Sequence, residues 1–400
     1  MSLSEPIVRG AQPEEFDEVT TLIARSFGEA PDDWPRQHVA RDPNHRPELH
    51  RVCVADGKVV SALRIVRHQV HYGGVLLEHA GIADVGTPPE LRRQGYSTRC
   101  LQDAIAFMER EGAHFSILYT GIQPFYERLG WAILPLRVPC YRLTGAPQPE
   151  EGVEVCPMSR EQHLAGVRAV YEAFNTQRTA TTVRSDRYWD LRPGEEAARE
   201  WLVALVDGQV VAYLSRHAHE RLICVQEYGW MGGHKQALRE LFAEAIRRGR
   251  EQDAEAIRCQ VGSDLGARDM LGELGEPTEP ICSDHLMLRV VDLPGLLKAV
   301  EPCLRERPHR GRSMPGAAAV NLRWQDQSVG LRYDNFLLSV VPAMSGRPTL
   351  EMNSAELGQL LFGDGLRGVP PARRLPPRER RLLEVVFPAE HFVFWETDEF

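Results

Sequence analysis

The stretch from Val85 to Thr98 combines residue types that can hold a phosphorylated ligand. It reads VGTPPELRRQGYST: the end of an apolar run, a turn with two prolines, two arginines, and a glycine before a helical pattern. Exposed amides at a helix start bind phosphate oxygens, and a glycine lets the backbone approach them closely. Arg92 or Arg93 can add charge-assisted hydrogen bonds. Taken alone this pattern is weak evidence, because an arginine and a glycine near a helix start are common.

A second informative group follows in the segment FYERLGW, from Phe125 to Trp131. A strand, a short helix carrying Tyr126, and the Leu-Gly-Trp sequence complete a strand–helix–strand–helix unit. A tyrosine hydroxyl in such a position can act as a general acid and protonate a leaving group. The alternative is packing, because a tyrosine on a short helix usually lies in the core.

Together the two groups resemble the GCN5-related N-acetyltransferase (GNAT) superfamily. There the pattern Arg/Gln-x-x-Gly-x-Gly/Ala grips the cofactor pyrophosphate, and a tyrosine before Gly-Phe/Trp sits near the thioester sulfur. Arg92, Gly95 and Ser97 occupy the pattern here, with Ser97 in place of the usual Gly or Ala. The resemblance implies acetyl-CoA as cosubstrate, and Tyr126 as the acid that protonates the departing thiolate. The residues expected to contact the cofactor are Val85, Gly86, Thr87, Arg92, Arg93, Gln94, Gly95, Tyr96, Ser97, Thr98, Gly121 and Ile122.

The same resemblance has a consequence for the strand that leads into the phosphate loop. The strand at 85–87 should diverge from its neighbour, so that its backbone can pair with the pantetheine arm. Amides aimed at the thioester carbonyl would stabilise the oxyanion.

The whole chain resembles a narrower group, the enhanced-intracellular-survival (Eis) family. In that family the α-carboxylate of the chain end acts as general base, which carried over is that of Phe400. A base is needed because an alkylammonium has a pKa near 10.4. The alternative is an ordinary surface terminus. The marks of the resemblance are Arg92-Arg93-x-Gly95, Tyr126, Tyr188-Trp189, the segment Leu288 to Pro294, and Phe400.

The Eis resemblance also implies the fold class, which is α/β and α+β. Two tandem GNAT-like mixed-sheet domains, the second degenerate, are followed by an α+β domain like sterol carrier protein. The expected boundaries are 1–148, 149–284 and 285–400. The implied acceptor is a primary amine, on an aminoglycoside-like polyamine or a lysine side chain, and the implied assembly is a homo-oligomer, a hexamer. The alternative function is a non-catalytic protein that binds a lipid or another small molecule through its C-terminal domain.

The elements that must position these residues recur along the chain. Residues 52–60 (VCVADGKVV) and 203–211 (VALVDGQVV) share an Asp-Gly turn between two strands. A helix, a strand and a short helix then follow in the same order, which predicts an internal duplication. Coincidence is the alternative, because Asp-Gly hairpins are common. The second copy has glycines but no arginine pair at 230–234, and Leu271 stands where a counterpart of Tyr126 would be, so we expect it not to catalyse.

Composition narrows the class of protein further. The chain has 400 residues with 43% hydrophobic and 26% charged, which suits two or three globular domains. The net charge of −9 argues against a nucleic-acid binder and favours small cationic substrates. No apolar run could span a membrane, and the first residues do not look like a signal peptide. The eight cysteines include no C-x-x-C pair, which favours free thiols in a reducing cytoplasm. His68-x-x-His71 has no third ligand nearby, so no metal site is expected.

Overall fold

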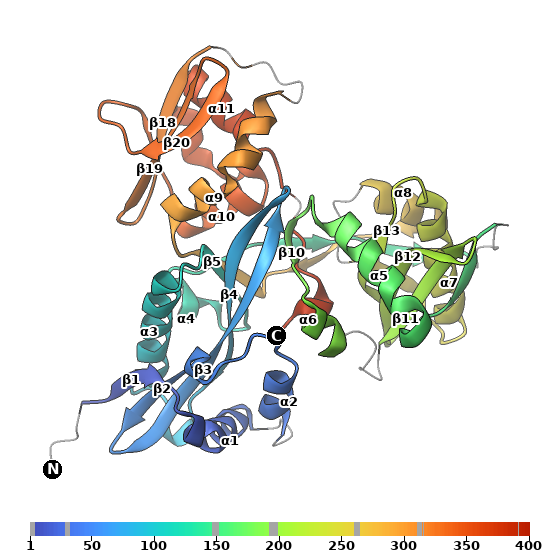
Figure 1. Cartoon of the computed structure of the whole chain (residues 1–400), viewed down its shortest axis with the longest axis horizontal. Helices are drawn as coiled ribbons and strands as arrows, with labels where there is room; N and C mark the ends of the chain where they lie inside the picture. The colour runs from blue at the N-terminus through green and yellow to red at the C-terminus, as the bar shows by residue number, and fades with distance from the viewer. Residues whose placement is uncertain are drawn as a thin grey trace.

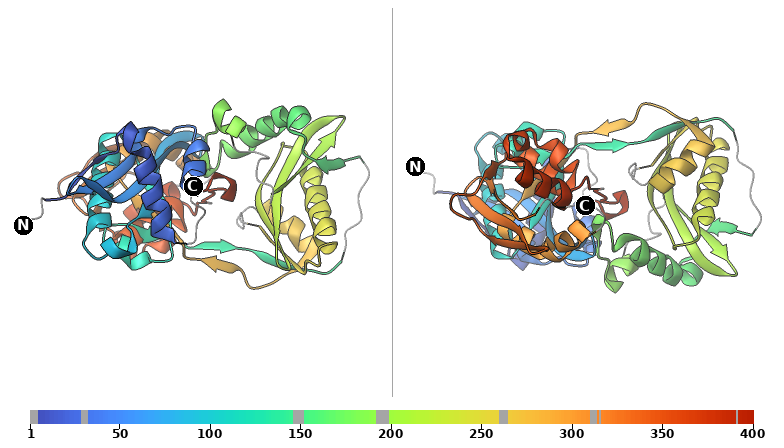
Figure 2. Two further views of the ribbon diagram at one scale, coloured as in Figure 1. Left: turned by 90° about the horizontal axis from the view of Figure 1, so that it is seen from below. Right: turned by 90° about the horizontal axis from the view of Figure 1, so that it is seen from above.

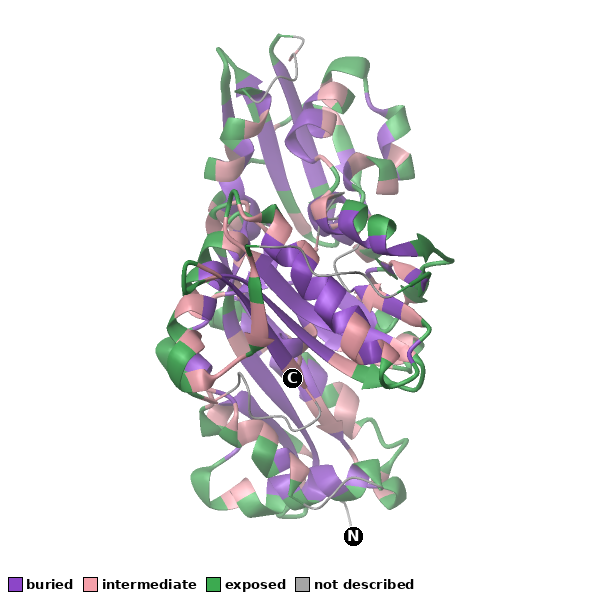
Figure 3. Ribbon diagram, turned by 90° about the vertical axis from the view of Figure 1, so that its right-hand side faces the viewer, coloured by how far each residue is buried: buried purple, intermediate pink, exposed green. Residues whose placement is uncertain are grey.

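The computed structural model describes residues 5–28, 33–145, 152–191, 199–259, 265–309, 314, 316–390 and 392–400. Over these residues the chain has a mixed α/β fold with sheets of eight, seven, four and two strands. The eight-stranded and seven-stranded sheets lie side by side, and the four-stranded sheet with its helices sits on one end of the first (Figure 1). The central strands of the three larger sheets are buried along most of their length, while the outer helix faces are exposed (Figure 3).

The first sheet and its helices come mainly from the N-terminal third of the chain. The bounds of these elements are β1 (Ile7–Gly10), α1 (Phe16–Phe27), α2 (Trp34–Ala40), β2 (His50–Ala55), β3 (Lys58–Tyr72), β4 (Val75–Gly86), α3 (Tyr96–Arg110), β5 (Phe115–Tyr119), α4 (Gln123–Glu127), β6 (Ala132–Ile133), β10 (Thr179–Thr182) and β17 (Leu286–Val290). The sheet order is β1-β2-β3-β4-β5-β17-β6, with β10 beside β3. Only β4 and β5 are parallel. The predicted hairpin between β2 and β3 is confirmed, and both Asp56 and Gly57 of its turn have positive φ.

The second sheet and its helices follow in the middle of the chain. Their bounds are β8 (Cys140–Leu143), β9 (Glu154–Pro157), α5 (Arg160–Asn175), α6 (Asp186–Leu191), β11 (Glu200–Val206), β12 (Gln209–His219), β13 (Leu222–Trp230), α7 (Lys235–Arg250), β14 (Ala256–Cys259), α8 (Leu265–Leu274) and β15 (Gly275–Pro277). The order is β9-β11-β12-β13-β14-β8-β15, and here too only one pair, β13 with β14, is parallel. Strand order and pairing sense thus repeat those of the first sheet, element for element.

The two sheets exchange one strand each. β8 follows the first sheet in sequence but pairs in the second, whereas β17 follows the second sheet and pairs between β5 and β6 of the first. The crossing segments, β7 (Leu136–Val138) and β16 (Ile281–Ser283), pair with each other as a ribbon between the sheets (Figure 2). Strands therefore cross both of the boundaries that were expected at 148/149 and 284/285.

The last part of the chain is an α+β unit. Its elements are α9 (Leu293–Glu306), β18 (Ala318–Trp324), β19 (Gln327–Asp334), β20 (Leu337–Pro342), β21 (Thr349–Glu351), α10 (Ser354–Phe362) and α11 (Pro377–Val386). An antiparallel meander of three strands is extended by β21, which runs parallel to β18. This unit shares one hydrophobic core with the first sheet. The Tyr72 hydroxyl of β3 donates to the Leu361 carbonyl at 2.9 Å across that junction.

The final residues run from this unit back to the other two. The Val393 amide donates to the Thr179 carbonyl at 2.8 Å. Val393 and Trp395 pack in the core of the second sheet, while Phe394 between them packs in the core that the first sheet shares with the last unit. An extended segment points successive side chains to opposite sides, so this tail joins two cores. The chain end lies between the two large sheets (Figures 1 and 2).

Candidate active site

β4 and β5 run parallel and pair at one point only. Within the described residues this pairing is confined to His79 and Phe115, so the strands diverge from there toward their carboxyl ends. A β-bulge adds to the divergence, because residues 62–64 of β3 face residues 83–86 of β4. Asp84 lies in this bulge with a φ of +57°, and a bulge bends the strand that carries it. The end of β4 thus has the divergence that a strand pairing with a pantetheine arm would need.

A buried ion cluster holds the bulge in place. Arg64 donates from Nε to Asp84 at 2.7 Å and from Nη1 to Asp42 at 3.2 Å, and these side chains are almost fully buried. Burial alone would raise the pKa of Asp84, but Arg64 and then His38 lower that pKa to about 2. The carboxylate therefore stays charged and stays paired. Removing Arg64 would leave buried negative charge without compensation.

Hydrogen bonds within the loop after β4, and from it to α1, hold the loop in place. Arg92 donates from Nε to the Thr87 carbonyl at 3.1 Å and from Nη2 to the Ser26 carbonyl at 2.7 Å. The Thr87 hydroxyl lies 2.8 Å from that of Ser61 and 2.5 Å from that of Ser97. Ser97 stands where the family pattern usually has Gly or Ala. Its hydroxyl is accommodated because it is hydrogen-bonded to that of Thr87.

The start of α3 is open to a phosphate group. Gly95 precedes the helix with a φ of +81°, a conformation that strongly favours glycine. A Cβ at Gly95 would meet no atom within 4 Å. The glycine is therefore required by the positive φ of the backbone and not by a lack of space for a side chain. No acidic residue occupies the first turn, and within the described residues no side chain caps it. The first amides of α3 are therefore available as donors, beside the exposed side chains of Arg93 and Gln94.

The remaining predicted cofactor positions flank the same region. Val85 and Gly86 end β4, and Tyr96 and Thr98 lie in the first turn of α3. The other two, Gly121 and Ile122, follow β5 and lead into α4, and the side chain of Ile122 is 61% exposed.

Tyr126 lies on α4 and is largely buried. Its ring makes edge contacts with Phe125 at 5.0 Å and Trp131 at 6.3 Å, measured between centroids. Burial raises the pKa of Tyr126 to about 12, so the hydroxyl keeps its proton at neutral pH. A general acid requires this protonation state, and a core tyrosine also has it.

The end of the chain reaches β4 where the two strands diverge. The ring of Phe400 lies directly on Gly81, so that a Cβ built on Gly81 would overlap it. The same ring is 6.0 Å from that of His79 and 5.9 Å from that of Phe394. A glycine at this position of β4 is therefore a condition for the observed path of the tail.

Glu399 lies beside Tyr119, at the carboxyl end of β5. Burial, followed by the Glu396 carboxylate, raises the pKa of Glu399 to about 7, although the Tyr119 hydroxyl acts in the opposite direction. Burial also raises the pKa of Tyr119 well above its usual value. The chain end thus brings a carboxyl group that titrates near neutral pH to the diverging strands.

A buried network from the second sheet anchors this tail. Arg184 donates to Asp398 at 2.9 Å, to both Glu227 oxygens at 2.9 and 2.7 Å, and to the Thr397 hydroxyl at 2.9 Å. The hydroxyls of Tyr188 and Thr397 donate to Asp398 and Glu227, respectively. Since all these groups are buried, the guanidinium offsets two carboxylates that water does not reach.

The neighbouring tail residues are held by the same sheet. Glu396 accepts from Gln226 of β13 at 3.1 Å and pairs with Arg258 of β14 at 3.3 Å. The indole of Trp395 donates to the Asn175 side chain at 3.0 Å. The tail therefore crosses the parallel pair β13–β14, the counterpart of β4–β5.

The second sheet lacks the chemical groups of the first. The turn after β13, residues 231–234, contains Gly233 with a φ of +90° but no arginine. Leu271 of α8 is buried in the core of the second sheet. Neither a phosphate-binding arginine nor a tyrosine acid is present at these positions.

Several residues at this site were not singled out from the sequence. A glycine inside an apolar strand often marks a close backbone approach, so Gly81 could have been singled out from the sequence on that ground. Tyr119 and Arg184 had none, because each looks ordinary in its local sequence. Asp398 is not available to attract a cation beside the chain end, because its charge is compensated by Arg184.

Residues 7–134 match the sequence model of the acetyltransferase (GNAT) domain. No curated protein matches the chain in sequence. A probable N-acyltransferase from Enterococcus faecalis shares the fold with a TM-score of 0.75 at 15% identity, over 98% of this chain and 97% of that one. A GCN5-related N-acetyltransferase from Kribbella flavida gives 0.72 at 20% identity, over 99% and 98%. Eis1 from Mycobacterium abscessus gives 0.68 at 16% identity, over 99% and 100%.

The domain match and the fold define the class. The chain carries a GNAT acetyltransferase domain over residues 7–134 and is an N-acetyltransferase, which uses acetyl-CoA as cosubstrate. No helix in the described part of the chain is long and apolar enough to cross a membrane. Among the same residues, no three His, Cys, Asp or Glu side chains gather as metal ligands would.

Proposed function

We propose that the protein transfers the acetyl group of acetyl-CoA directly to a primary amine. Tyr126 is the general acid and the α-carboxylate of Phe400 is the general base. The observation that carries this proposal is the path of the tail, which brings Phe400 onto Gly81 of β4 where β4 and β5 diverge. An enzyme of this kind needs a base for the ammonium proton, and the α-carboxylate of the residue whose ring packs on β4 is the candidate for it.

The proposed roles follow from the groups around this strand. The first amides of α3, with Arg92 and Arg93, bind the pyrophosphate, and the unpaired edge of β4 binds the pantetheine arm. The chain-end carboxylate takes a proton from the alkylammonium, and the free amine attacks the thioester carbonyl. The carbon–sulfur bond breaks, and the Tyr126 hydroxyl gives its proton to the thiolate. The nitrogen loses its second proton as the amide forms, and that proton restores the Tyr126 hydroxyl through solvent. Backbone amides of β4 stabilise the charge that develops on the carbonyl oxygen.

The proposed acceptor is a cation, on an aminoglycoside-like polyamine or a lysine side chain. Glu399 adds negative charge beside the chain end above pH 7, and the chain as a whole carries a net charge of −9. Both features favour a positively charged substrate over a neutral one.

We further propose that the chain is of the Eis type. Its three domains then correspond to residues 1–148, 149–284 and 285–400: a catalytic GNAT domain, a degenerate copy and a unit like sterol carrier protein. β8 of the first domain pairs in the second sheet, and β17 at the start of the third pairs in the first sheet. The repeated strand order of the two sheets supports the duplication, and the full-length fold shared with Eis1 supports the kinship. A homohexamer in the cytoplasm belongs to the same proposal and rests on the resemblance.

The proposal is tested by moving the terminal carboxylate. Two glycines added after Phe400 should lower kcat at least 100-fold, because a positioned general base contributes about 10²–10⁴ in rate. The matched control is Phe400→Leu, which keeps the carboxylate at the same residue and should retain kcat within about tenfold, on the same basis. Thiol release from acetyl-CoA is followed over a panel of amines, with mass spectrometry confirming the last residue of each variant. An extended enzyme as active as the parent would refute the terminal base.

A further inference from the structure

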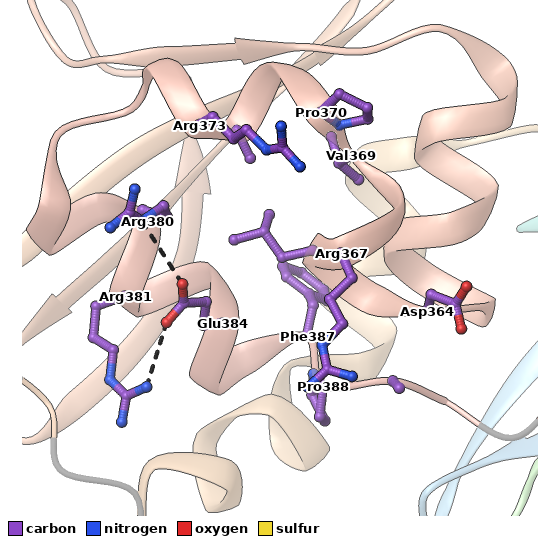
Figure 4. Close-up of a pocket in the computed structure, with 13 residues that line it drawn as sticks. Asp364, Arg367, Val369, Pro370, Arg373, Arg380, Arg381, Glu384, Phe387 and Pro388 are labelled. Carbon is purple, nitrogen blue, oxygen red and sulfur yellow. Dashed lines mark hydrogen bonds and ion pairs between the residues drawn. The ribbon is translucent and has the colours of Figure 1, made fainter.

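A second candidate site lies in the last unit of the chain, outside the acetyl-transfer site. Its cavity of about 810 Å³ opens among α11 and the turns on either side of it (Figure 4). Small-molecule sites usually have volumes of about 300–1,000 Å³. The residues that line it share one stretch of the chain and are Asp364, Leu366, Arg367, Val369, Pro370, Ala372, Arg373, Arg380, Arg381, Glu384, Phe387, Pro388 and Ala389.

The charge of this stretch differs from that of the rest of the chain. Residues 366–381 (LRGVPPARRLPPRERR) contain six arginines and one glutamate, in a chain whose net charge is −9. Four of these arginines line the cavity. A local concentration of guanidinium groups in an acidic protein creates a positive potential that attracts anions.

Two of the four lining arginines already have partners. Arg380 and Arg381 both pair with Glu384, at 3.7 and 3.3 Å. Arg367 and Arg373 form no ion pair with any described residue, and Figure 4 shows both among the cavity side chains with no dashed line to a neighbour. A guanidinium stays charged at every physiological pH and carries five donors. Arg367 and Arg373 can therefore take up an anionic group without first losing a partner.

The floor of the cavity has the opposite character. Leu366, Pro370, Pro388 and Ala389 line it with apolar side chains that keep surface exposed to solvent. An apolar floor contributes affinity only to a ligand that brings apolar surface. A bare inorganic ion would use the arginines but leave this floor uncovered.

We propose that this cavity binds an organic anion, in which a phosphate or carboxylate group is attached to an apolar body. The head group lies between Arg367 and Arg373, and the body covers Pro370 and Pro388. A concave pocket of this size favours a small molecule over a nucleic acid. Two sources share this chemistry, namely an acyl-chain amphiphile and a nucleoside phosphate. The site is independent of the proposed acetyl transfer, since none of its lining residues belongs to that reaction.

The test measures binding by isothermal titration calorimetry with the full-length chain. The probes are dodecyl phosphate and dodecanoate below their micelle concentrations, AMP, dodecanol and inorganic phosphate. We expect either a dodecyl anion or AMP to bind at one site per chain, at least tenfold more tightly than dodecanol or inorganic phosphate. The better probe identifies the source. The double variant Arg367→Ala/Arg373→Ala should bind it at least 30-fold more weakly, because charge-assisted hydrogen bonds are lost.

The matched control is Arg374→Ala, which removes an exposed arginine next to Arg373 that does not line the cavity. It should change affinity less than twofold. Because Arg367 and Arg373 are exposed, the double variant should unfold at the same temperature as the parent without ligand. The proposal is overturned if no anionic probe binds, if inorganic phosphate binds as tightly as the best of them, or if the double variant binds as well as the parent.

Discussion

The two large sheets share a strand order but differ in what occupies their one parallel strand pair. In the first sheet, β4 has a bulge opposite β3 and diverges from β5, the following helix starts on Gly95 with open amides, and Tyr126 lies on α4. In the second, the chain's own tail crosses β13 and β14, where Glu396 accepts a hydrogen bond from Gln226 and forms an ion pair with Arg258. The same framework thus supports two roles. The first sheet carries the groups that the proposed acetyl transfer uses, and the second holds the segment that ends at the first.

This comparison predicts the largest effect at the anchor of the tail. Arg184→Met leaves Glu227 and Asp398 buried without their cation, which should cost about 3–5 kcal/mol in the free energy of unfolding. Activity should fall with it, because the tail loses its anchor. Urea denaturation and thiol-release kinetics measure the two effects. Arg168→Met, which breaks an exposed pair with Asp186, should cost less than about 1 kcal/mol. Equal costs for both variants would show that the network does not hold the tail.

The next largest effect is expected at the acid of the first copy. Tyr126→Phe should lower kcat about 100-fold or more, because the thiolate then leaves without a proton donor. The KM for acetyl-CoA should stay nearly constant. Tyr213→Phe, which removes a buried hydroxyl bonded to Glu227 in the second copy, should reduce stability without a comparable loss of kcat in the folded enzyme. Unchanged turnover in Tyr126→Phe would leave that tyrosine with a packing role only.

A third change tests the contact between strand and tail. Gly81→Ala places a Cβ where the ring of Phe400 lies, so the chain end must move away from β4. We expect kcat to drop at least tenfold, as 1 Å displacements of catalytic groups cost about 10²-fold in rate. Gly272→Ala serves as the control, because its Cβ would enter open space on α8. If Gly81→Ala is as active as the control, the observed position of Phe400 is not required for catalysis.

The smallest effect concerns pH. Burial raises the pKa of Glu399 to about 7 from an ordinary value of 4.5, so the fold favours its protonated form. The resulting stabilisation is complete below pH 4.5 and is lost as the pH rises through 7. Glu399→Gln should therefore match the parent in stability at pH 4 and exceed it at pH 8, by about 1–3 kcal/mol.

The same substitution should alter the acceptor kinetics. In the parent, kcat/KM for an ammonium acceptor should fall as the pH drops below 7, because Glu399 loses its charge. In Glu399→Gln this decrease of kcat/KM below pH 7 should be absent, and the KM for the acceptor should be a few-fold higher at pH 8. Parallel pH profiles for the two proteins would exclude Glu399 from substrate attraction.

Local sequence was sufficient for the features whose causes are local. The Asp-Gly turns predicted both hairpins, and the glycine before α3 predicted a helix start with open amides, because each depends on a few adjacent residues. The tail network was not predictable in this way. Arg184, Glu227 and Asp398 lie far apart in the chain, and an isolated charged residue is usually exposed. Only the fold brings them together and excludes water from them.

The strand exchange was also beyond sequence reasoning. β8 and β17 are short apolar strands, and nothing in their composition shows which sheet each will join. The adjacent position in sequence favours the wrong sheet in both cases, because consecutive elements usually pack together. Both strands are placed by long-range pairing instead.

This exchange has a consequence for how the protein is made. Tyr119 pairs with Leu286, so the first sheet is completed only after nearly three quarters of the chain has left the ribosome. Until β17 arrives, β5 presents an open edge, which is a hazard for aggregation during synthesis. The second sheet lies within residues 140–277, but the strands of the first span residues 7–290, so the first sheet cannot be cut out as a contiguous fragment without the second. The acetyltransferase domain is therefore expected to be recovered in active form only from the complete polypeptide.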